Sequence, residues 1–177
     1  MELMHRSKNL YNAALYNVRQ HYFKSKDDTT VKYKYLNYYA NWRQLSSTQN
    51  PDFKALSCHI AQQVIRQVDN NFSSFFALLK KKAKGMYTLP VQLPKYLKTD
   101  GVNQIVIDQW SRKKLQEGYL QIPITMILIN IGKDVAKLNI KQIRLIPCNG
   151  YITIEFIYEV PDVQTKQDNK RYMSIDL

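Results

Sequence analysis

The stretch IKQIRLIPCNGYITIEFIYEV, residues 140–160, places two alternating apolar and polar runs on either side of Asn149 and Gly150. Runs of this kind, rich in isoleucine and aromatic residues, predict half-buried strands. An Asn-Gly pair suits the tight turns with positive φ angles that join antiparallel strands. The stretch therefore predicts a β-hairpin, and with it a sheet in the second half of the chain.

Three further strand candidates precede this hairpin, separated by proline, glycine and asparagine. They are NQIVID (103–108), LQEGYLQIP (115–123) and ITMILINI (124–131). Short strands with tight connections predict a small antiparallel β-barrel over residues 85–165, with Trp110 and Leu115 in an irregular or short helical link. The apolar run in the third candidate is too short for a membrane span and carries polar residues, so it predicts a buried strand.

The first 84 residues show the 3.6-residue period of helices instead. One apolar face recurs from Leu3 to Tyr22, and the polar stretch KSKDDTT interrupts it. A second helix should then run to about Gln44, capped by Asp28 or Thr30. Its buried face is expected to be aromatic; the expected members are Val31, Tyr35, Tyr38, Tyr39, Trp42 and Leu45.

A third helix carries an apolar seam from Leu56 to Leu79 and should end before Gly85. Asn50 followed by Pro51 marks its expected start, and Ser57 offers a second start if the first turn is irregular. Three helices with apolar stripes are expected to pack as a bundle. The sequence therefore predicts an α+β fold, with a three-helix bundle followed by a small barrel.

Charge is the unusual property of the chain, which has 26 Lys and Arg against 14 Asp and Glu, a net charge of +12. Residues 1–84 hold 14 of the basic and 5 of the acidic side chains. Such an excess makes a polyanion, RNA or DNA, the first candidate partner. No membrane partner and no small-molecule substrate is expected, and nothing in the sequence indicates the oligomeric state.

The compartment follows from the cysteines and from the first residues. Cys58 and Cys148 are far apart with no second thiol near either, which argues against a zinc site and is typical of a reducing compartment. The opening MELMHRSKNL has charges where a signal peptide needs an apolar run. These features predict a soluble cytoplasmic protein.

The clearest local signal is KKKAKGMYTLPVQLPKYLK, residues 80–98, in which lysines end a helix and then follow a proline-rich link. These lysines are Lys80, Lys81, Lys82, Lys84, Lys95 and Lys98. One interpretation is that they complement the helix macrodipole and keep an exposed end soluble. The other is a phosphate-binding ridge, with Tyr87 and Tyr96 close by to stack on bases. The net charge of the chain leaves both interpretations open.

A second candidate contact is KYKYLNYYANWR, residues 32–43. Most of its aromatic positions recur at helical spacing and are predicted to be core. Tyr33 falls off that face, so Tyr33 with Lys32, Lys34 and Arg43 is a candidate contact to nucleic acid. The three histidines have no metal-binding spacing, and the body of the chain has no glycine-rich phosphate loop, no GxSxG motif and no Cys/His dyad.

Several stretches, taken in order, resemble the TnpB (OrfB) family of insertion-sequence proteins, the RNA-guided nucleases akin to type V CRISPR effectors. The stretches are SKNLYNAALYNVRQ (7–20), AQQVIRQVDNNFSSFFALLKK (61–81), LPKYLK (93–98), EGYLQIP (117–123), IKQIRLIPCNGYITIEFIYEV (140–160) and YMSIDL (172–177). The resemblance implies a helical recognition lobe over residues 1–84 and a wedge-type barrel over 85–165, which holds guide RNA and reads the motif beside the DNA target. It implies a linker and the first strand of an RNase H-like, RuvC-type nuclease domain over 166–177, and a prokaryotic, nucleoid-associated protein.

The resemblance also assigns Asp176 as the first catalytic carboxylate and as a ligand of Mg²⁺. Cleavage by two metal ions needs several carboxylates around two Mg²⁺ ions, and the family supplies a glutamate and a second aspartate later in its sequence. The chain is therefore expected to bind guide RNA and DNA, to hold no tightly bound Mg²⁺ and to be inactive alone. Two alternatives stay open: a free-standing regulator derived from the family, and a nuclease completed by a second chain.

One departure from the family lies at the front of the chain. The family usually has a basic strand before its first helix, and that strand joins the barrel. Here Met1 leads almost directly into the helical pattern. The barrel is therefore expected to lack a strand, which would leave an unpaired edge.

Overall fold

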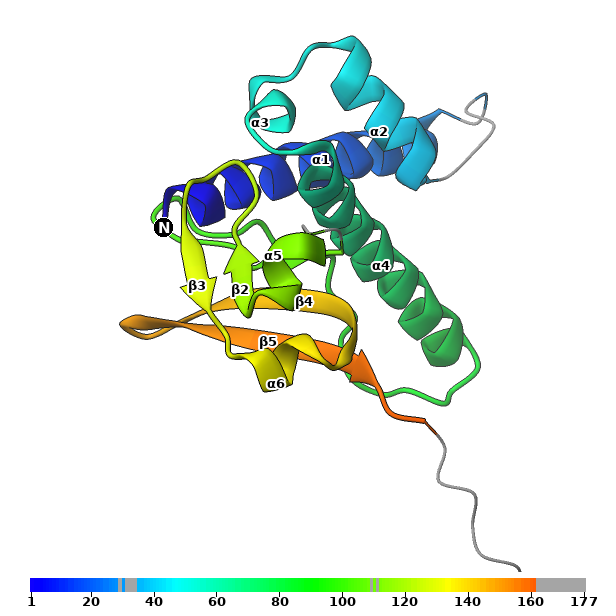
Figure 1. Cartoon of the computed structure of the whole chain (residues 1–177). Coiled ribbons are helices and arrows are strands. Elements are labelled where there is room, and N and C mark those ends of the chain that lie inside the picture. Colours follow the sequence, from blue (N-terminus) through cyan, green and yellow to red (C-terminus); the bar gives the residue numbers. More distant parts are fainter. Residues whose placement is uncertain (29, 31–34, 109, 111, 162–177) are drawn as a thin grey trace, which may run out of the picture.

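The structure, a computed structural model, describes residues 1–28, 30, 35–108, 110 and 112–161, with only the main chain at 112 and 113. The described residues form six helices and five strands (Figure 1). Four helices come first, and the strands follow with two short helices between them. The predicted α+β class is confirmed.

Three helices and one extra turn make up the N-terminal bundle: α1 (Glu2–Asp27), α2 (Tyr38–Ser47), α3 (Pro51–Lys54) and α4 (Cys58–Ala83). The long helices α1 and α4 pack against each other, and α2 contacts both. The seam between the long helices buries Leu10, Ala14 and Val18 of α1 and Val68 and Phe72 of α4. Burial of these apolar faces holds the bundle together.

The start of α2 differs from the prediction. Asn37 caps this helix, because its side-chain oxygen accepts from the Ala40 N–H at 3.0 Å. Asp28 instead follows the last residue of α1, and its carboxylate accepts from Thr30 N at 2.9 Å and from Thr30 Oγ1 at 2.6 Å. These bonds lower the pKa of Asp28. Asp28 is therefore engaged in a local turn and does not cap the second helix.

The aromatic face of α2 is also narrower than predicted. Trp42 and Leu45 join the core, whereas Tyr39 is 73% exposed. The Tyr39 ring lies edge-on to Tyr38, with 5.0 Å between the centroids. With the helix beginning at Tyr38, only one side of its ten residues faces the bundle, and Tyr39 falls on the other side.

The third predicted helix divides at the position that Ser57 marks. Asn50 caps the single turn α3, and its side chain accepts from the N–H groups of Asp52 and Phe53. Ser57 Oγ then accepts from the Ile60 N–H at 3.4 Å and begins α4. The second start is therefore the one that the long helix uses.

Each predicted strand stretch contains a strand. The strands are β1 (Ile105–Ile107), β2 (Tyr119–Gln121), β3 (Leu128–Asn130), β4 (Asn139–Cys148) and β5 (Tyr151–Glu159). The short helices α5 (Arg112–Gln116) and α6 (Lys133–Ala136) lie between them. The predicted hairpin is confirmed: β4 and β5 pair antiparallel, and Gly150 turns between them at φ 86°, a value that glycine adopts without strain.

The predicted barrel is not closed in the described residues. β1, β4 and β5 form one antiparallel sheet in the order β1-β4-β5, and β2 pairs only with β3 in a second. The second sheet is only three residues long on each side, and none of its backbone pairs reaches the first sheet. Both sheets instead contribute buried side chains to one core, among them Ile143 of β4 and Leu120 of β2.

The helices and the sheets share one core. β1 lies against both α1 and α4, and its residues Ile105 and Ile107 are fully buried. The long helices end at Ala83, and strands joined by short helices follow, as the change of sequence period predicts. The side of α4 that faces away from the bundle core lies beside the sheet, and the candidate site lies between the two.

Candidate nucleic-acid interface

One face of α4 is polar from Gln63 to Ser74. Its apolar seam, which includes Ile60, Val64 and Phe72, is buried and so fixes how the helix is rotated. Polar side chains at three- and four-residue steps therefore face outward together; they are Gln63, Gln67, Asn70, Asn71 and Ser74. Lys81 stands eighteen residues after Gln63, five full turns along, so it lies on the same face about 27 Å away.

A groove of about 350 Å³ lies between this face and the outer face of the sheet. We call it the amide groove; its lining residues are Gln63, Arg66, Gln67, Asn70, Asn71, Gln104, Val106, Gln142 and Arg144. The alternation of β4 explains the sheet side, because Ile143 and Leu145 point into the core and Gln142 and Arg144 point to the groove.

Hydrogen bonds fix several of these side chains. Gln67 and Asn103 exchange side-chain bonds, at 3.0 Å for Asn103 Nδ2 to Gln67 Oε1 and 3.5 Å in the other direction. Gln63 Nε2 donates to Asp108 Oδ2 at 2.6 Å. Arg144 Nε donates to Gln142 Oε1 at 2.8 Å. The groove is therefore a preorganised set of amides and guanidinium groups.

The charges of the two arginines in the amide groove are free to interact with a ligand. The Arg66 guanidinium carbon lies 5.5 Å from the centroid of the Tyr38 ring, and Arg144 is held by a neutral amide. Within the described part of the chain, neither forms an ion pair. Guanidinium and amide groups are the side chains that recognise phosphates and base edges.

A second hollow, of about 270 Å³, continues along α4 and shares Asn71 with the amide groove. Asn71 Nδ2 donates to Tyr11 Oη at 2.8 Å, and burial raises the pKa of Tyr11. Ser74 and Lys95 also line this hollow. The predicted contact Lys95, which comes from a different segment, is therefore brought beside α4.

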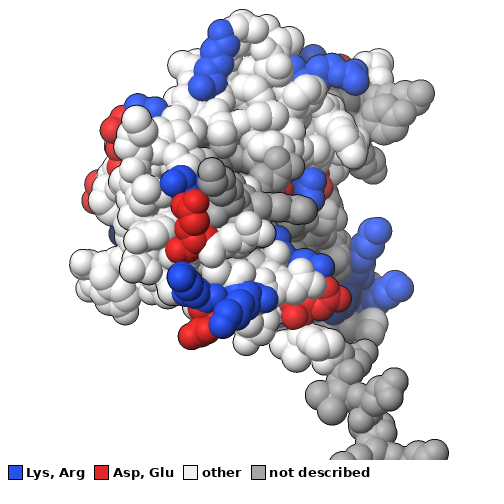
Figure 2. All heavy atoms as spheres, viewed as in Figure 1, with Lys and Arg blue, Asp and Glu red and all other residues white. Residues whose placement is uncertain are grey.

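At the end of α4 lies the lysine ridge, which we define as Lys80, Lys81, Lys82 and Lys84. All four side chains are exposed, and in the described residues no carboxylate forms an ion pair with them. Gly85, at φ 71°, ends the helix with bonds from Gly85 N to Lys82 O and from Met86 N to Lys81 O, both 3.0 Å. Figure 2 shows basic side chains projecting at the lower right, where this end of α4 lies.

Of the tyrosines predicted to stack on bases, Tyr96 is 43% exposed and Tyr87 is half-buried. The Arg19 guanidinium carbon lies 4.9 Å from the centroid of the Tyr96 ring, so Arg19 already covers one ring face. Lys98 is exposed in the same segment. Tyr96 and Lys98 belong to the α1 strap, residues 94–104, whose main chain is hydrogen-bonded along α1.

The other predicted contacts are not gathered here. Arg43 is exposed on α2, which packs near the N-terminal half of α4 and far from the lysine ridge (Figure 1). Lys32, Lys34 and the proposed catalytic Asp176 lie outside the described residues. In the part that is described, no group of three His, Cys, Asp or Glu could hold a metal ion. No helix described in the structure has the length and apolarity needed to span a membrane.

Sequence reasoning missed the amide groove and the α1 strap. The amides at helical steps opposite the apolar seam of α4 are a signal that could have indicated the groove. For Gln142 and Arg144, the sequence indicates only that they are the outward-facing positions of an alternating strand. Nothing local in the sequence indicates that Lys8, Asn12 and Arg19 bind main-chain carbonyls more than seventy positions away.

Comparison of the chain with protein-family models, with curated protein sequences and with solved structures finds no match in any of the three.

Proposed function

We propose that this chain binds RNA and DNA, as the nucleic-acid-binding portion of a TnpB-like RNA-guided DNA endonuclease. The observation that carries the proposal is one face of α4 that lines the amide groove from Gln63 to Asn71 and, beyond Ala77 and Leu78, presents Lys81 of the lysine ridge. Grooves that hold single-stranded nucleic acid combine positive charge along the backbone path with flat groups that contact the bases.

The charges on this face favour a polyanion over a purely solubilising role. Basic side chains that only maintain solubility need not lie in a groove. Here Arg66, Arg144 and Lys95 line two hollows beside the same helix. The distance from Gln63 to Lys81, about 27 Å, matches about eight nucleotides at 3.4 Å each along one strand of a duplex. A short run of nucleic acid can therefore contact both ends of the face.

The TnpB-like part of the proposal rests on the ordered resemblance of six stretches and on a helical part followed by a β part. In this proposal the helices and the sheet together hold guide RNA and the DNA beside the target. Asp176 is one carboxylate of a nuclease site that needs further carboxylates and uses Mg²⁺. The chain alone then binds nucleic acid without cutting it.

The test is to purify the whole chain from cells without nuclease treatment and to sequence the RNA that remains bound. One structured RNA species enriched over total cellular RNA supports a guide RNA. A heterogeneous mixture supports the alternative of a free-standing binder. The affinity for structured RNA should also fall linearly with salt on logarithmic axes, and a flat response from low to physiological salt excludes the charged face as the binding surface.

A further inference from the structure

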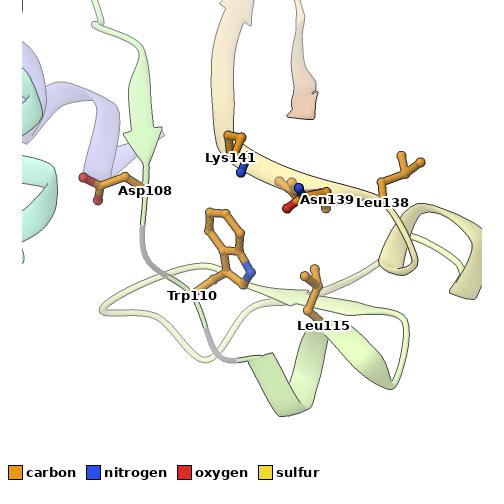
Figure 3. Close-up of a pocket in the computed structure, with 7 residues that line it drawn as sticks. Asp108, Trp110, Leu115, Leu138, Asn139 and Lys141 are labelled. Atoms are coloured by element: carbon orange, nitrogen blue, oxygen red, sulfur yellow. The ribbon is translucent and has the colours of Figure 1, made fainter. Parts of the chain in front are cut away.

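A separate hollow of about 760 Å³ lies beside α5 and the start of β4, and the proposed function does not yet use it (Figure 3). We call it the Trp110 pocket; its lining residues are Asp108, Trp110, Leu115, Leu138, Asn139, Ile140 and Lys141. Its volume falls in the range of small-ligand sites, which combine apolar walls with a few placed polar groups. Here the indole of Trp110 and the side chains of Leu115 and Ile140 supply the apolar surface.

The basic side chain that lines the Trp110 pocket is already paired. Lys141 Nζ lies 2.7 Å from Glu159 Oε2 across the hairpin, and Lys141 lowers the pKa of Glu159. Nearby, Lys114 pairs with Glu117 and Lys137 with Asp134. Figure 2 shows acidic and basic side chains side by side over the lower part of the molecule. The described lining of the pocket therefore offers no unpaired positive charge and does not select a phosphate.

One hydrogen bond fixes the orientation of the Asn139 side-chain amide. Asn139 Nδ2 donates to Glu159 Oε2 at 2.9 Å, and because an ionised carboxylate only accepts hydrogen bonds, the nitrogen must face it. The oxygen Oδ1 then remains as an acceptor, and no donor in the described residues bonds to it. Figure 3 shows this amide group on the side of the pocket that faces Trp110.

Asp108, by contrast, contributes little to recognition in the pocket. Its carboxylate turns toward α4, where Oδ2 accepts from Gln63 Nε2 at 2.6 Å. Its Oδ1 is buried without a hydrogen-bond partner in the described structure. The groups left to recognise a ligand are the Trp110 indole and the Asn139 oxygen, which is an aromatic face opposite a hydrogen-bond acceptor.

We propose that the Trp110 pocket takes one unpaired adenine of the bound RNA. The purine stacks on the indole, and its exocyclic amine donates to Asn139 Oδ1. Uracil presents a carbonyl oxygen where adenine presents that amine, so it is disfavoured at this position. Sequence-specific RNA recognition commonly uses such splayed bases, stacked on aromatic side chains and read at their edges. This inference rests on the proposed function, since the base arrives as part of a bound RNA.

The test compares the hexaribonucleotides A6 and U6, which carry equal charge, so that a difference in affinity reports the bases. A Trp42→Phe background leaves Trp110 as the one tryptophan reporter. We expect A6 to quench its fluorescence and to bind more tightly than U6. Trp110→Ala should weaken A6 binding by about 5- to 150-fold, the measured range for one stacked base, with an unchanged salt dependence.

Two further variants separate recognition from folding. Asn139→Leu, at an exposed position, should remove the preference for A6 while U6 binds as before. Tyr151→Ala removes an exposed aromatic ring at the other end of the β4–β5 hairpin and should change neither affinity. If Trp110→Ala proves unfolded by circular dichroism, the quenching and the Asn139→Leu result decide the matter.

The outcomes distinguish this inference from the proposed function. Salt-dependent binding of A6 and U6 with equal affinity, or unquenched Trp110 at saturating A6, overturns the adenine pocket and leaves the proposed function standing. Failure of every RNA to bind overturns both.

Discussion

The side chain of Asn12 forms two hydrogen bonds with the main chain of Leu97, eighty-five positions later in the sequence. Asn12 Nδ2 donates to Leu97 O at 3.0 Å, and Leu97 N donates to Asn12 Oδ1 at 2.9 Å. Lys8 Nζ and Arg19 Nη1 donate to further carbonyls of the α1 strap, at 2.8 and 3.2 Å. The connection between helices and sheets is thus fastened along α1, and Lys95 and Tyr96 are placed with it.

Asn12→Ala should lower the free energy of unfolding by about 1–3 kcal/mol, because a half-buried N–H and carbonyl of Leu97 lose their partners. Asn12→Asp keeps the acceptor for Leu97 N but sets a carboxylate oxygen against Leu97 O, so it should also destabilise the fold. Urea denaturation measures both. Asn9→Ala, an exposed change on the same helix, is the control. A cost for Asn12→Ala no larger than that of the control would show that this pair of hydrogen bonds contributes nothing.

Ile143 of β4 is fully buried in the core to which both sheets contribute, so truncating it tests that core. Ile143→Val should cost about 0.5–1.5 kcal/mol and Ile143→Ala about 2–5 kcal/mol in thermal or urea unfolding. Ile146→Val removes the same methyl group on the outer face of β4, where the side chain is half-buried, and should cost less. Equal costs at the two positions would contradict the assignment of the inner face.

The sequence predicted the elements whose signals are local. The Asn149–Gly150 turn, the end of α4 before Gly85 and the capping role of Ser57 each depend on residues within a few positions. The start of α2 was wrong because Asp28 finds a partner two residues away in Thr30, an alternative that a capping pattern does not distinguish.

The arrangement of those elements depended on distant contacts. Whether five strands close a barrel depends on pairing between short strands, and β2 with β3 has too few residues to fix it by pattern. The candidate site likewise has a part that the sequence indicates locally and a part that depends on distant contacts. Exposed lysines were visible in the sequence, but the amide groove exists only because α4 and the sheet meet, with Gln67 bonded to Asn103.

Replacing the four residues of the lysine ridge with Ala should reduce the slope of log K against log salt for single-stranded RNA. Each lysine–phosphate pair contributes about 0.7 to that slope, so removing four of them should lower its magnitude by about 3. The matched control is Lys24, Lys54, Lys133 and Lys137 changed to Ala, which removes the same charge from other exposed positions. Equal slopes for the two quadruple variants would assign the effect to net charge and not to the ridge.

Arg66→Ala and Arg144→Ala should each weaken RNA binding by about 1–3 kcal/mol, the range for a guanidinium that contacts a base edge or phosphate directly. Fluorescence anisotropy with a labelled RNA measures the loss of affinity, and circular dichroism checks the fold. Arg43→Ala is the control, because that exposed arginine lies on α2 away from the amide groove. If only Arg43→Ala weakens binding, the interface lies on α2 and the groove assignment fails.

Mg²⁺ should produce no cleavage of DNA or RNA by this chain. Two-metal hydrolysis needs several carboxylates around ions about 4 Å apart, and the family resemblance assigns only Asp176. A lone carboxylate holds Mg²⁺ weakly, because the ion retains most of its water. Cleavage assays with labelled DNA and RNA, with and without added guide, should therefore show the same background for the chain and for Asp176→Ala. Binding of RNA by the two should also be equal. Mg²⁺-dependent cleavage that disappears in Asp176→Ala would show instead that the carboxylate completes a working site, either within this chain or with a second copy.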